Sequence, residues 1–362
     1  MKRRDLLTLA AAGGALAACD SGSQSVAAAP QPQQRFTWKM YTTWPKNFPG
    51  LGTGANYLAE AIGKASGGRL TIKVYGAGER VPALEVFDAV SSGAAEMGHG
   101  AAYYWKGKAP ASSFFTGVPF GLTAQEMNGW LEFGGGNALW QELYAPFNLV
   151  PFAAGNTGTQ MGGWFRKEIH SVADLKGLKL RMPGLGGEVM ARAGATTVNI
   201  PGGELFTALE SGAIDATDWV GPYNDLAFGL YKAAKHYYYP GWQETGATLE
   251  AIVNRDAWDV LPDDLKEIVR VCAAAADRRM LSEYAARNQS ALETLVNEHG
   301  VKVHAYPDDL IAKLQEISDQ LLEDMAAADS FTAKVYASYK AYRDSVVRST
   351  AFAEKAYLNL RR

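Results

Sequence analysis

An arginine and an Asp–Trp pair, about forty residues apart, each follow a short segment that the sequence predicts to be a strand. Arg181 comes just before Pro183, which ends its strand, and Asp218 and Trp219 follow the strand-like run 213–217. A guanidinium can bind a carboxylate through two parallel hydrogen bonds. A neighbouring carboxylate can hold a hard cation against the same ligand. Together these residues predict a binding site for a small organic acid.

Two stretches of the chain resemble each other and indicate how such a site is built. Residues 85–96 and 204–215 match at six of twelve positions without a gap. Each predicts a helix that ends at a glycine, Gly93 or Gly212, and then leads into a strand. A duplicated α/β unit explains the match, and chance in an Ala/Gly-rich sequence is the alternative. Both strands end where open α/β sheets bind ligands.

The other segments continue this alternation of short strands and helices. In a first lobe we expect strands at 37–42, 70–75 and 96–100 and helices at 54–66 and 82–91. In a second lobe we expect strands at 150–154, 163–166, 178–181, 197–200 and 214–220 and helices at 186–193 and 203–211. The pattern predicts an α/β fold of two doubly wound, mainly parallel sheets that close on a ligand by a hinge.

The predicted division of the chain follows from these elements. We expect a signal peptide at 1–18, a flexible tether at 20–34, lobe 1 at 35–150, lobe 2 at 151–261 with strands that cross back to lobe 1, and a helical region at 262–362. A short extended break at 302–306 interrupts the helices. The tail at 335–360 carries a stripe of tyrosines, and we expect it both to clasp the lobes and to form a homodimer contact.

The N-terminus has the features of an export signal. Arg3 and Arg4 precede the apolar stretch Leu6–Ala18, which is too short to span a bilayer as a mature helix. The arginine pair favours twin-arginine export, and an ordinary secretory leader is the alternative. Cys19 follows a lipobox-like stretch and is predicted to be acylated, unless cleavage near the same point leaves it incidental. Asp20 is typical of lipoproteins kept at the inner membrane.

Composition excludes several classes of function. The formal net charge is −3, and because the leader carries a net +2 the remainder carries −5, which does not favour nucleic acid. With Cys19 acylated, Cys272 has no partner for a disulfide, and we expect it in a helical core. After residue 35 no apolar run approaches the roughly 18 residues of a membrane span. About 330 residues favour two lobes over one core.

Several segments carry a resemblance to a known family. These are LKGLKLRMPG (175–184), NTGTQMGGWFRKEI (156–169), RMPGLGGEVMARAGAT (181–196) and DWVGPYNDL (218–226). Together with the leader and the helical C-terminal region, they resemble the periplasmic, DctP-type solute-binding subunits of TRAP transporters over essentially the whole mature chain. The resemblance implies a two-lobe periplasmic-binding-protein fold and a receptor, not an enzyme. It also implies two membrane subunits as partners, one small and one large.

The last three segments are similar to the branch of this family that binds 2-oxo or 2-hydroxy monocarboxylates, such as pyruvate or lactate, with a metal ion. By this resemblance, Arg181 would bind the carboxylate of the substrate. Asn156 or Tyr103 would contact its second polar group. Gln160 and Trp219 would line the same substrate site.

The resemblance also implies a set of metal ligands. Gln160 would contribute its side-chain oxygen, Asp218 its carboxylate and Trp219 its backbone carbonyl. Gln243 is the further ligand that we expect, with Glu244 as the second choice. Oxygen donors suit Ca²⁺, and Na⁺ is the alternative.

Purely structural roles stay open for the same residues. Arg181 can instead pair with a structural acid, Asp218 can cap a helix that begins near Pro222, and Gln160 can belong to an ordinary loop. We expect His99 to be a satisfied residue of the cleft wall and not a ligand. The five histidines show no spacing typical of a transition-metal site.

Two other functions compete with this prediction. A receptor of an ABC importer for organic acids is the runner-up, because such receptors also have two lobes that close on a ligand. A lipoprotein hydrolase is less favoured, because the sequence has no nucleophile elbow, P-loop or dinucleotide fingerprint. The genes beside this one separate the two receptor functions, since an ABC importer requires a nucleotide-binding subunit.

Overall fold

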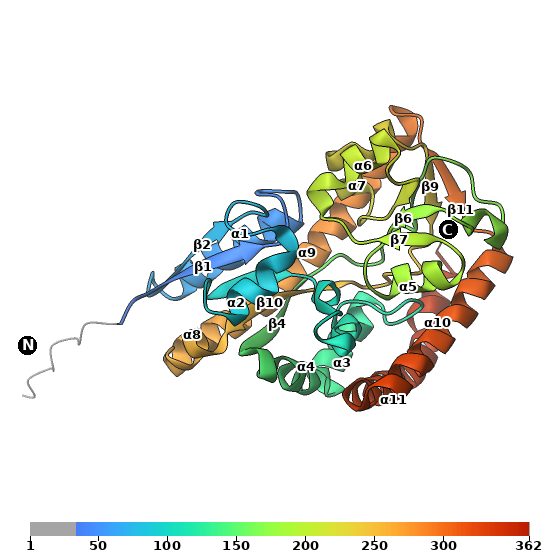
Figure 1. Cartoon of the computed structure of the whole chain (residues 1–362). Helices are drawn as coiled ribbons and strands as arrows, with labels where there is room; N and C mark the ends of the chain where they lie inside the picture. Colours follow the sequence, from blue (N-terminus) through green and yellow to red (C-terminus); the bar gives the residue numbers. More distant parts are fainter. Residues whose placement is uncertain (1–33, 362) are drawn as a thin grey trace, which may run out of the picture. The chain divides into compact units, whose positions relative to one another are not determined.

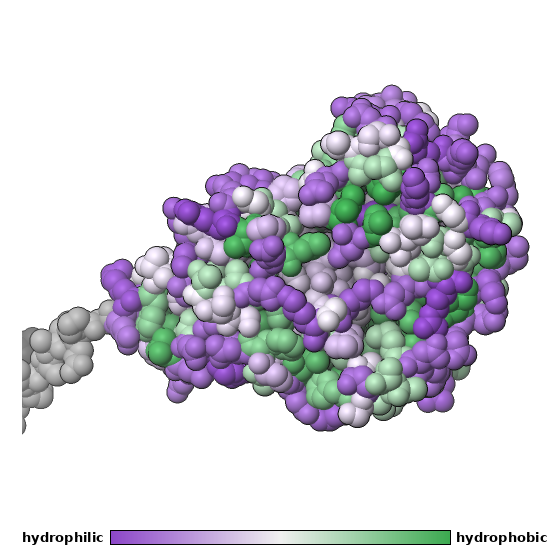
Figure 2. Space-filling view, viewed as in Figure 1, coloured by the Kyte–Doolittle hydropathy of each residue, from purple (hydrophilic) through white to green (hydrophobic). Residues whose placement is uncertain are grey.

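A computed structural model describes residues 34–361. The predicted signal peptide, Cys19 and the tether up to residue 33 lie outside the described residues. Residues Arg35–Arg362 form one compact unit with two β-sheets (Figure 1). None of the helices in the described residues combines the length and apolar character that a bilayer span requires. In the view of Figure 2 hydrophilic residues cover most of the outer surface, and apolar residues form separate patches.

The first sheet has the strand order β2-β1-β3-β10-β4. Its strands are β1 (Phe36–Thr42), β2 (Leu70–Tyr75), β3 (Met97–Gly100), β4 (Leu149–Asn156) and β10 (Thr248–Asn254). β1 runs parallel to β2 and β3, whereas β10 runs antiparallel to β3 and β4. The strand predicted at 150–154 forms, but it lies in this first sheet and not with the strands of the second lobe.

The second sheet has the strand order β11-β9-β5-β8-β6-β7. Its strands are β5 (Gly163–Phe165), β6 (Lys179–Arg181), β7 (Thr196–Val198), β8 (Ala216–Thr217), β9 (His236–Tyr239) and β11 (Lys302–Ala305). β5 runs antiparallel to β8 and β9, and the other pairs are parallel. The predicted α/β fold is confirmed, but the expectation of mainly parallel sheets is wrong for β5 and β10. Each of these is the first strand after the chain crosses from the other sheet.

Two short crossover segments join the sheets, residues 157–162 between β4 and β5 and residues 240–247 between β9 and β10. Backbone hydrogen bonds hold the crossovers together: Gln160 N donates to Glu244 O (3.1 Å), and Gly241 N donates to Gln160 O (3.0 Å). A Cβ atom at Gly241 would lie 2.2 Å from the carbonyl oxygen of Gln160. Only glycine allows so close an approach of the two backbones.

Short helices connect the strands. They are α1 (Leu51–Ala65), α2 (Val86–Ser91), α3 (Ala124–Phe133), α4 (Gly136–Tyr144), α5 (Gly184–Arg192), α6 (Leu205–Ser211), α7 (Pro222–Phe228) and α8 (Arg255–Asp259). The two similar stretches of sequence fold alike, since α2 and α6 each follow a single 3-10 turn. Gly93 and Gly212 then adopt φ of 79° and 78°, a left-handed conformation that favours glycine, before β3 and β8 begin.

The C-terminal region is helical, as predicted, with a break at β11. It comprises α9 (Asp263–Asn297), α10 (Asp308–Ala328), α11 (Ser330–Phe352) and α12 (Glu354–Leu358). Buried residues of α9 recur every three or four positions, at Leu265, Val269, Cys272, Ala276 and Met280. Cys272 is thus a packed core residue, as expected. α9 packs against α1 and β4 and also against α7, so one helix contacts the surroundings of both sheets (Figure 1).

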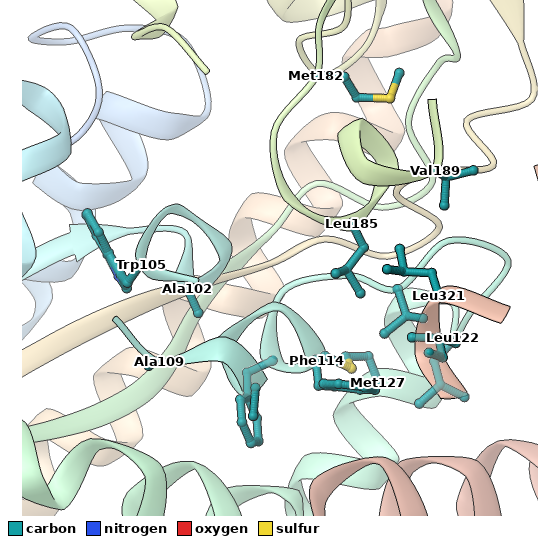
Figure 3. Close-up of a cluster of buried hydrophobic side chains, with 14 of the residues drawn as sticks. Ala102, Trp105, Ala109, Phe114, Leu122, Met127, Met182, Leu185, Val189 and Leu321 are labelled. Atoms are coloured by element: carbon teal, nitrogen blue, oxygen red, sulfur yellow. The ribbon is translucent and has the colours of Figure 1, made fainter. Parts of the chain in front are cut away.

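The largest hydrophobic cluster contains residues that pack beside the first sheet and residues that pack beside the second. Figure 3 labels members from the segment that follows β3, such as Trp105 and Phe114, together with Leu185 and Val189 of α5 and Leu321 of α10. α10 packs against α5, and α11 packs against α3 and α4. The tail therefore clasps the body of the protein, as one of the two expectations for it stated.

Candidate functional site

The register of the second sheet places Arg181 and Asp218 side by side. β6 and β8 are parallel neighbours with Arg181 opposite Thr217, so both strands end at the same edge. Asp218 N donates to Arg181 O (3.1 Å), which ties the two strand ends together. The Arg181 side chain donates from Nη1 to Asp218 Oδ1 (3.0 Å) and from Nε to Ile200 O (3.2 Å). Arg181 is only 1% exposed and Asp218 is fully buried.

Five buried polar atoms in this region have no hydrogen-bond partner among the described residues, and one of them is Trp219 Nε1; the other four belong to charged or amide groups. These four are Arg181 Nη2, Asp218 Oδ2, Gln160 Oε1 and Gln243 Oε1. Gln160 donates from Nε2 to Glu244 Oε2 (2.7 Å), and Gln243 donates from Nε2 to Met161 O (2.8 Å). In each amide the nitrogen is therefore hydrogen-bonded, and the oxygen is available to a ligand. Because an unpaired buried polar group costs about 1–3 kcal/mol, such a set is typical of a binding site.

Two buried carboxyl groups share the single charge of Arg181. Burial raises the pKa of Asp218 to about 7, although the Arg181 charge pulls it down. Burial, followed by the charge of Asp218, raises the pKa of Glu244 well above its usual value. Two ionised carboxylates and one guanidinium leave one negative charge in excess in a medium that penalises it. The donor set, all oxygens, therefore fits a hard cation such as Ca²⁺ or Na⁺.

Aromatic side chains from both sheets surround the guanidinium. The Trp219 ring centroid lies 5.4 Å from Arg181 Cζ, a cation–π contact. Trp44, which follows β1, and Phe48 meet the Trp219 ring edge-on at centroid distances of 6.3 and 6.2 Å. These contacts bring the first sheet against the site on the second.

Tyr103 completes this side of the site. It lies in the 3-10 turn Ala102–Trp105, directly after β3, and its ring packs edge-on against Tyr104 at 4.8 Å. Burial and the charge of Glu244 raise the pKa of Tyr103 well above its usual value, which keeps the phenol neutral and able to donate a hydrogen bond. Tyr104 is half-buried beside Tyr103 and also packs against Trp44 at a centroid distance of 6.2 Å.

Asn156 and His99 are both hydrogen-bonded within the protein. Asn156 donates to Gly246 O and Thr248 Oγ1 (both 3.2 Å) and accepts from Gly158 N (2.8 Å), so its whole amide supports the crossover segments. His99 accepts from Trp44 Nε1 at Nδ1 (2.8 Å), and burial lowers its pKa to about 4. It is a satisfied, neutral residue, as expected.

The helix after Asp218 is held by another acid. α7 begins at Pro222, and Asp225 accepts hydrogen bonds from Val220 N and Gly221 N (3.3 and 3.2 Å). Asp225 also accepts from Trp164 Nε1 and Tyr237 Oη (2.8 and 2.6 Å). Asp225 thus fixes the loop after Asp218, and no side chain among the described residues caps α7, so the capping alternative for Asp218 is wrong. The acid three residues after Pro222 was the available signal.

A polar contact closes the edge of the site. Lys106, just after the turn that carries Tyr103, donates to Gly184 O (3.2 Å) and forms an ion pair with Glu188. Gly184 and Glu188 belong to α5, beyond Arg181. Asn224 of α7 likewise donates to Pro49 O (2.8 Å). The site is therefore enclosed by contacts between segments that follow different sheets.

Two of the histidines, which are far apart in the sequence, lie close together in the structure. Although no local spacing indicates a metal site, His236 and His304 lie next to each other and close to Glu168, because β9 pairs with β11. This cluster lies apart from Arg181, because β5 and β8 separate β9 from β6 in the sheet.

Two sheets joined by short crossovers, with a buried charged site between them, define a two-lobe solute-binding protein. The chain belongs to bacterial extracellular solute-binding protein family 7 (DctP), whose model matches residues 41–329. The predicted family and fold are thus confirmed. Members of this family are solute-binding receptors and not enzymes, and the family places the chain in the periplasm.

Named relatives describe what similar chains bind. A monocarboxylate 2-oxoacid-binding periplasmic protein of Nostoc sp. is 46% identical over 99% of this chain and 98% of its own length. A TRAP periplasmic solute-binding protein from Pseudoalteromonas atlantica, solved with sodium and pyruvate, has 44% identity and a TM-score of 0.89, covering 91% of this chain and all of that one. Its counterpart from Colwellia psychrerythraea, solved with calcium and pyruvate, has 42% identity and a TM-score of 0.88 with the same coverage. These similarities favour a TRAP receptor over the receptor of an ABC importer.

Proposed function

We propose that this chain is the receptor of a TRAP transporter for a small 2-oxo or 2-hydroxy monocarboxylate, similar to pyruvate or lactate, bound together with Ca²⁺ or Na⁺. One observation carries the proposal: the unpaired Arg181 Nη2 lies in the same buried site as the unpaired oxygens of Asp218, Gln160 and Gln243. A donor for a carboxylate and acceptors for a cation are what such a chelated ligand requires.

Charge supports the pairing of cation and anion. With both Asp218 and Glu244 ionised beside Arg181, the site carries an excess of one negative charge. A divalent cation together with a monocarboxylate brings the sum to zero. In this proposal Asp218, Gln160, Gln243 and the backbone carbonyl of Trp219 hold the cation, with Glu244 as a further oxygen donor.

The organic part of the ligand is recognised by the aromatic side chains. Tyr103 donates a hydrogen bond to the second polar group of the ligand, and the Trp219 ring packs on its short tail. Asn156 acts through the crossover segments, because its amide is fully used there. Since every one of these residues is buried, the ligand enters an open form and the hinge then closes on it. Closure offers a surface to the membrane subunits that the open form lacks.

Arginine variants test the proposal by calorimetry and thermal shift. Pyruvate with Ca²⁺ should raise the melting temperature of the wild type, and Arg181→Ala should remove that increase. Arg181→Lys should also be impaired, because an ammonium cannot reproduce the guanidinium fork. Arg192→Ala is the matched control, since Arg192 is a partly exposed arginine that pairs with Asp324. Unchanged affinity in Arg181→Ala would contradict the proposal.

Attachment to the membrane is a separate proposal. Acylation of Cys19 would anchor the chain, and Asp20 would keep it at the inner membrane, with residues 20–34 as the tether. Each buried methylene contributes roughly 0.8 kcal/mol, so two or three acyl chains anchor stably. Cys19→Ser should release the protein into the soluble periplasmic fraction, and mass spectrometry of the mature N-terminus checks the modification.

We also propose a homodimer through the end of the tail. Phe352 and Leu360 are 87% and 78% exposed, and Tyr357 and Leu358 of α12 are more than half exposed. A cluster of exposed apolar side chains at a chain end is typical of an interface. Light scattering should give a dimer for the full chain and a monomer for a chain that ends at residue 351. A monomeric full chain would contradict this assignment.

A further inference from the structure

We infer a second metal site, for a transition-metal cation of the zinc class, formed by Glu168, His236 and His304 at the outer edge of the second sheet. One ligand atom from each of these residues lies within 4.8 Å of the ligand atoms of the others. The site is separate from the oxygen-rich site around Arg181 and serves no step of ligand capture described above.

The pairing of β9 with β11 creates this cluster. The two strands run parallel with His304 opposite Tyr238, and Tyr238 shares a face with His236 because side chains alternate along a strand. The two histidines therefore project from the same face, 68 residues apart in sequence. β5 is the other neighbour of β9, with Phe165 opposite His236, and Glu168 follows β5 by three residues. Figure 1 shows β9 and β11 together at this edge.

The distances between the ligand atoms suit a tetrahedral ion. His236 Nδ1 lies 3.0 Å from His304 Nε2, whereas it is the other ring nitrogen of His304, Nδ1, that lies 3.4 Å from Glu168 Oε1. His304 gives one ion only one of these nitrogens, and the three ligand atoms then lie within 4.8 Å of one another. Two nitrogens bound to one zinc ion at 2.0–2.1 Å in tetrahedral geometry are about 3.3 Å apart. By this distance the nitrogens need to separate by only a few tenths of an ångström, and the rings must also turn so that both lone pairs point at the ion. The His304 ring is held in place against Tyr238, at a centroid distance of 5.1 Å and an angle of 23°.

The chemistry of the cluster favours a metal over a shared proton. Two facing imidazoles share one proton in a hydrogen bond, and a second proton would set two positive rings against each other. A metal ion is bound by the lone pair of a neutral imidazole nitrogen. When His304 offers Nε2 to the ion, its other ring nitrogen, Nδ1, still faces the Glu168 carboxylate. Glu168 also supplies negative charge to a divalent ion.

The donor set distinguishes this site from the first. Two imidazoles and one carboxylate suit Zn²⁺, Ni²⁺ or Cu²⁺, whereas Ca²⁺ and Na⁺ prefer oxygens alone. Side chains of His304 and Glu168 are 21% and 43% exposed, so an ion reaches them from solvent without any opening of the lobes. A bound ion would join β9, β11 and the segment after β5, and it would stabilise this edge of the sheet.

Calorimetry with Zn²⁺ tests the site. The full chain is purified through an affinity tag without histidine and is first saturated with Ca²⁺ and pyruvate, so that the oxygen ligands are occupied. We expect one equivalent of Zn²⁺ to bind and to raise the melting temperature. His236→Gln and His304→Gln should each weaken this binding at least tenfold, and Glu168→Gln should weaken it by about 10–100-fold.

The control is His299→Gln, because His299 stacks on Tyr231 at 3.9 Å and does not belong to the cluster. It should bind Zn²⁺ like the wild type. Spectra of the Co²⁺ form should show bands of a histidine-bound tetrahedral ion that disappear in the double variant of His236 and His304. Absence of Zn²⁺ binding in the wild type, or equal binding in the double variant, would overturn the inference. Either result is independent of whether pyruvate binds at Arg181.

Discussion

Arg181 and Asp218 form a buried ion pair that uses only one atom on each side, Nη1 of the guanidinium and Oδ1 of the carboxylate, at 3.0 Å. The second terminal nitrogen and the second carboxylate oxygen have no partner among the described residues. A structural ion pair would gain most from the bidentate geometry that arginine offers. The single contact instead leaves one donor and one acceptor for a ligand. The alternative in which Arg181 serves only a structural acid therefore explains less of its environment.

Asp218→Asn should remove the response to cations while it leaves the fold intact. The amide keeps the shape and one oxygen but loses the charge that holds a cation. Calorimetric titration with Ca²⁺ should show at least a tenfold loss of affinity. Asp259→Asn on the exposed α8 is the matched control and should bind as the wild type does. Equal Ca²⁺ affinity in both variants would exclude Asp218 from the cation site.

Glu244→Gln should change which cation the site prefers. In the wild type Gln160 Nε2 donates to Glu244 Oε2. The variant keeps an oxygen for this contact and removes one negative charge. The affinity for Ca²⁺ should fall more than that for Na⁺, because the divalent ion gains more from each carboxylate. Competition of the two cations in the presence of pyruvate measures the ratio. A proportional loss for both ions would show that charge balance does not set the preference.

Lys106→Met should speed the release of ligand. The variant removes the contacts with Gly184 O and Glu188 across the edge of the site and keeps most of the side-chain volume. The side chains of Lys106 and Glu188 are both more than a third exposed, so their ion pair is weak. We therefore expect only a few-fold rise in the dissociation rate of the ligand, which corresponds to less than about 1 kcal/mol. Stopped-flow fluorescence measures this rate. The control is Lys108→Met, whose partner Asp88 lies on α2 near the same sheet, and a rise of equal size there would argue against the assigned role of Lys106.

Glu250→Gln should flatten the dependence of stability on pH. Burial raises the pKa of Glu250 to about 7, although hydrogen bonds from Trp105 Nε1 and Tyr144 Oη favour its charged form. Between the unfolded value of about 4.3 and pH 7, the native carboxyl therefore keeps a proton that the unfolded chain has lost. The native state binds more protons, so the free energy of unfolding falls as the pH rises through this window.

The Glu250 contribution to this fall is on the order of 2–3 kcal/mol and should be absent in the variant. Urea unfolding at pH 5 and pH 8 measures the difference between variant and wild type, which removes the contribution of other buried acids. The exposed Glu210→Gln is the control and should keep the wild-type slope. A variant with the full wild-type slope would show that Glu250 does not cause it.

The sequence predicted elements well where a local rule determines them. Pro262 and Pro307 precede α9 and α10, and Gly93 and Gly212 end the two similar helices with positive φ. The pairing of Arg181 with Asp218 also follows from two strands that end before a Pro or Gly-Pro break.

Non-local pairing explains what the sequence did not predict. β4 joins the first sheet because it pairs with β10, about one hundred residues later, and no local signal encodes that partner. The cluster of His236 and His304 was not predicted for the same reason, because it forms only when β9 pairs with β11. Asp225 was not singled out, since its burial and contacts arise only after the loop around it has folded.

The crossover segments give the molecule a further property. Gln160 lies on residues 157–162, and Gln243 and Glu244 lie on residues 240–247, the stretches in which the backbone must rotate when the sheets change their angle. Any such rotation alters the spacing of the oxygens that would hold a cation. If the open and closed forms differ in their affinity for the cation, binding of the cation shifts the open–closed equilibrium. By thermodynamic linkage the shift equals the ratio of the two affinities. The cation would thus stabilise the closed form, and its concentration around the receptor would set the fraction of molecules that are closed.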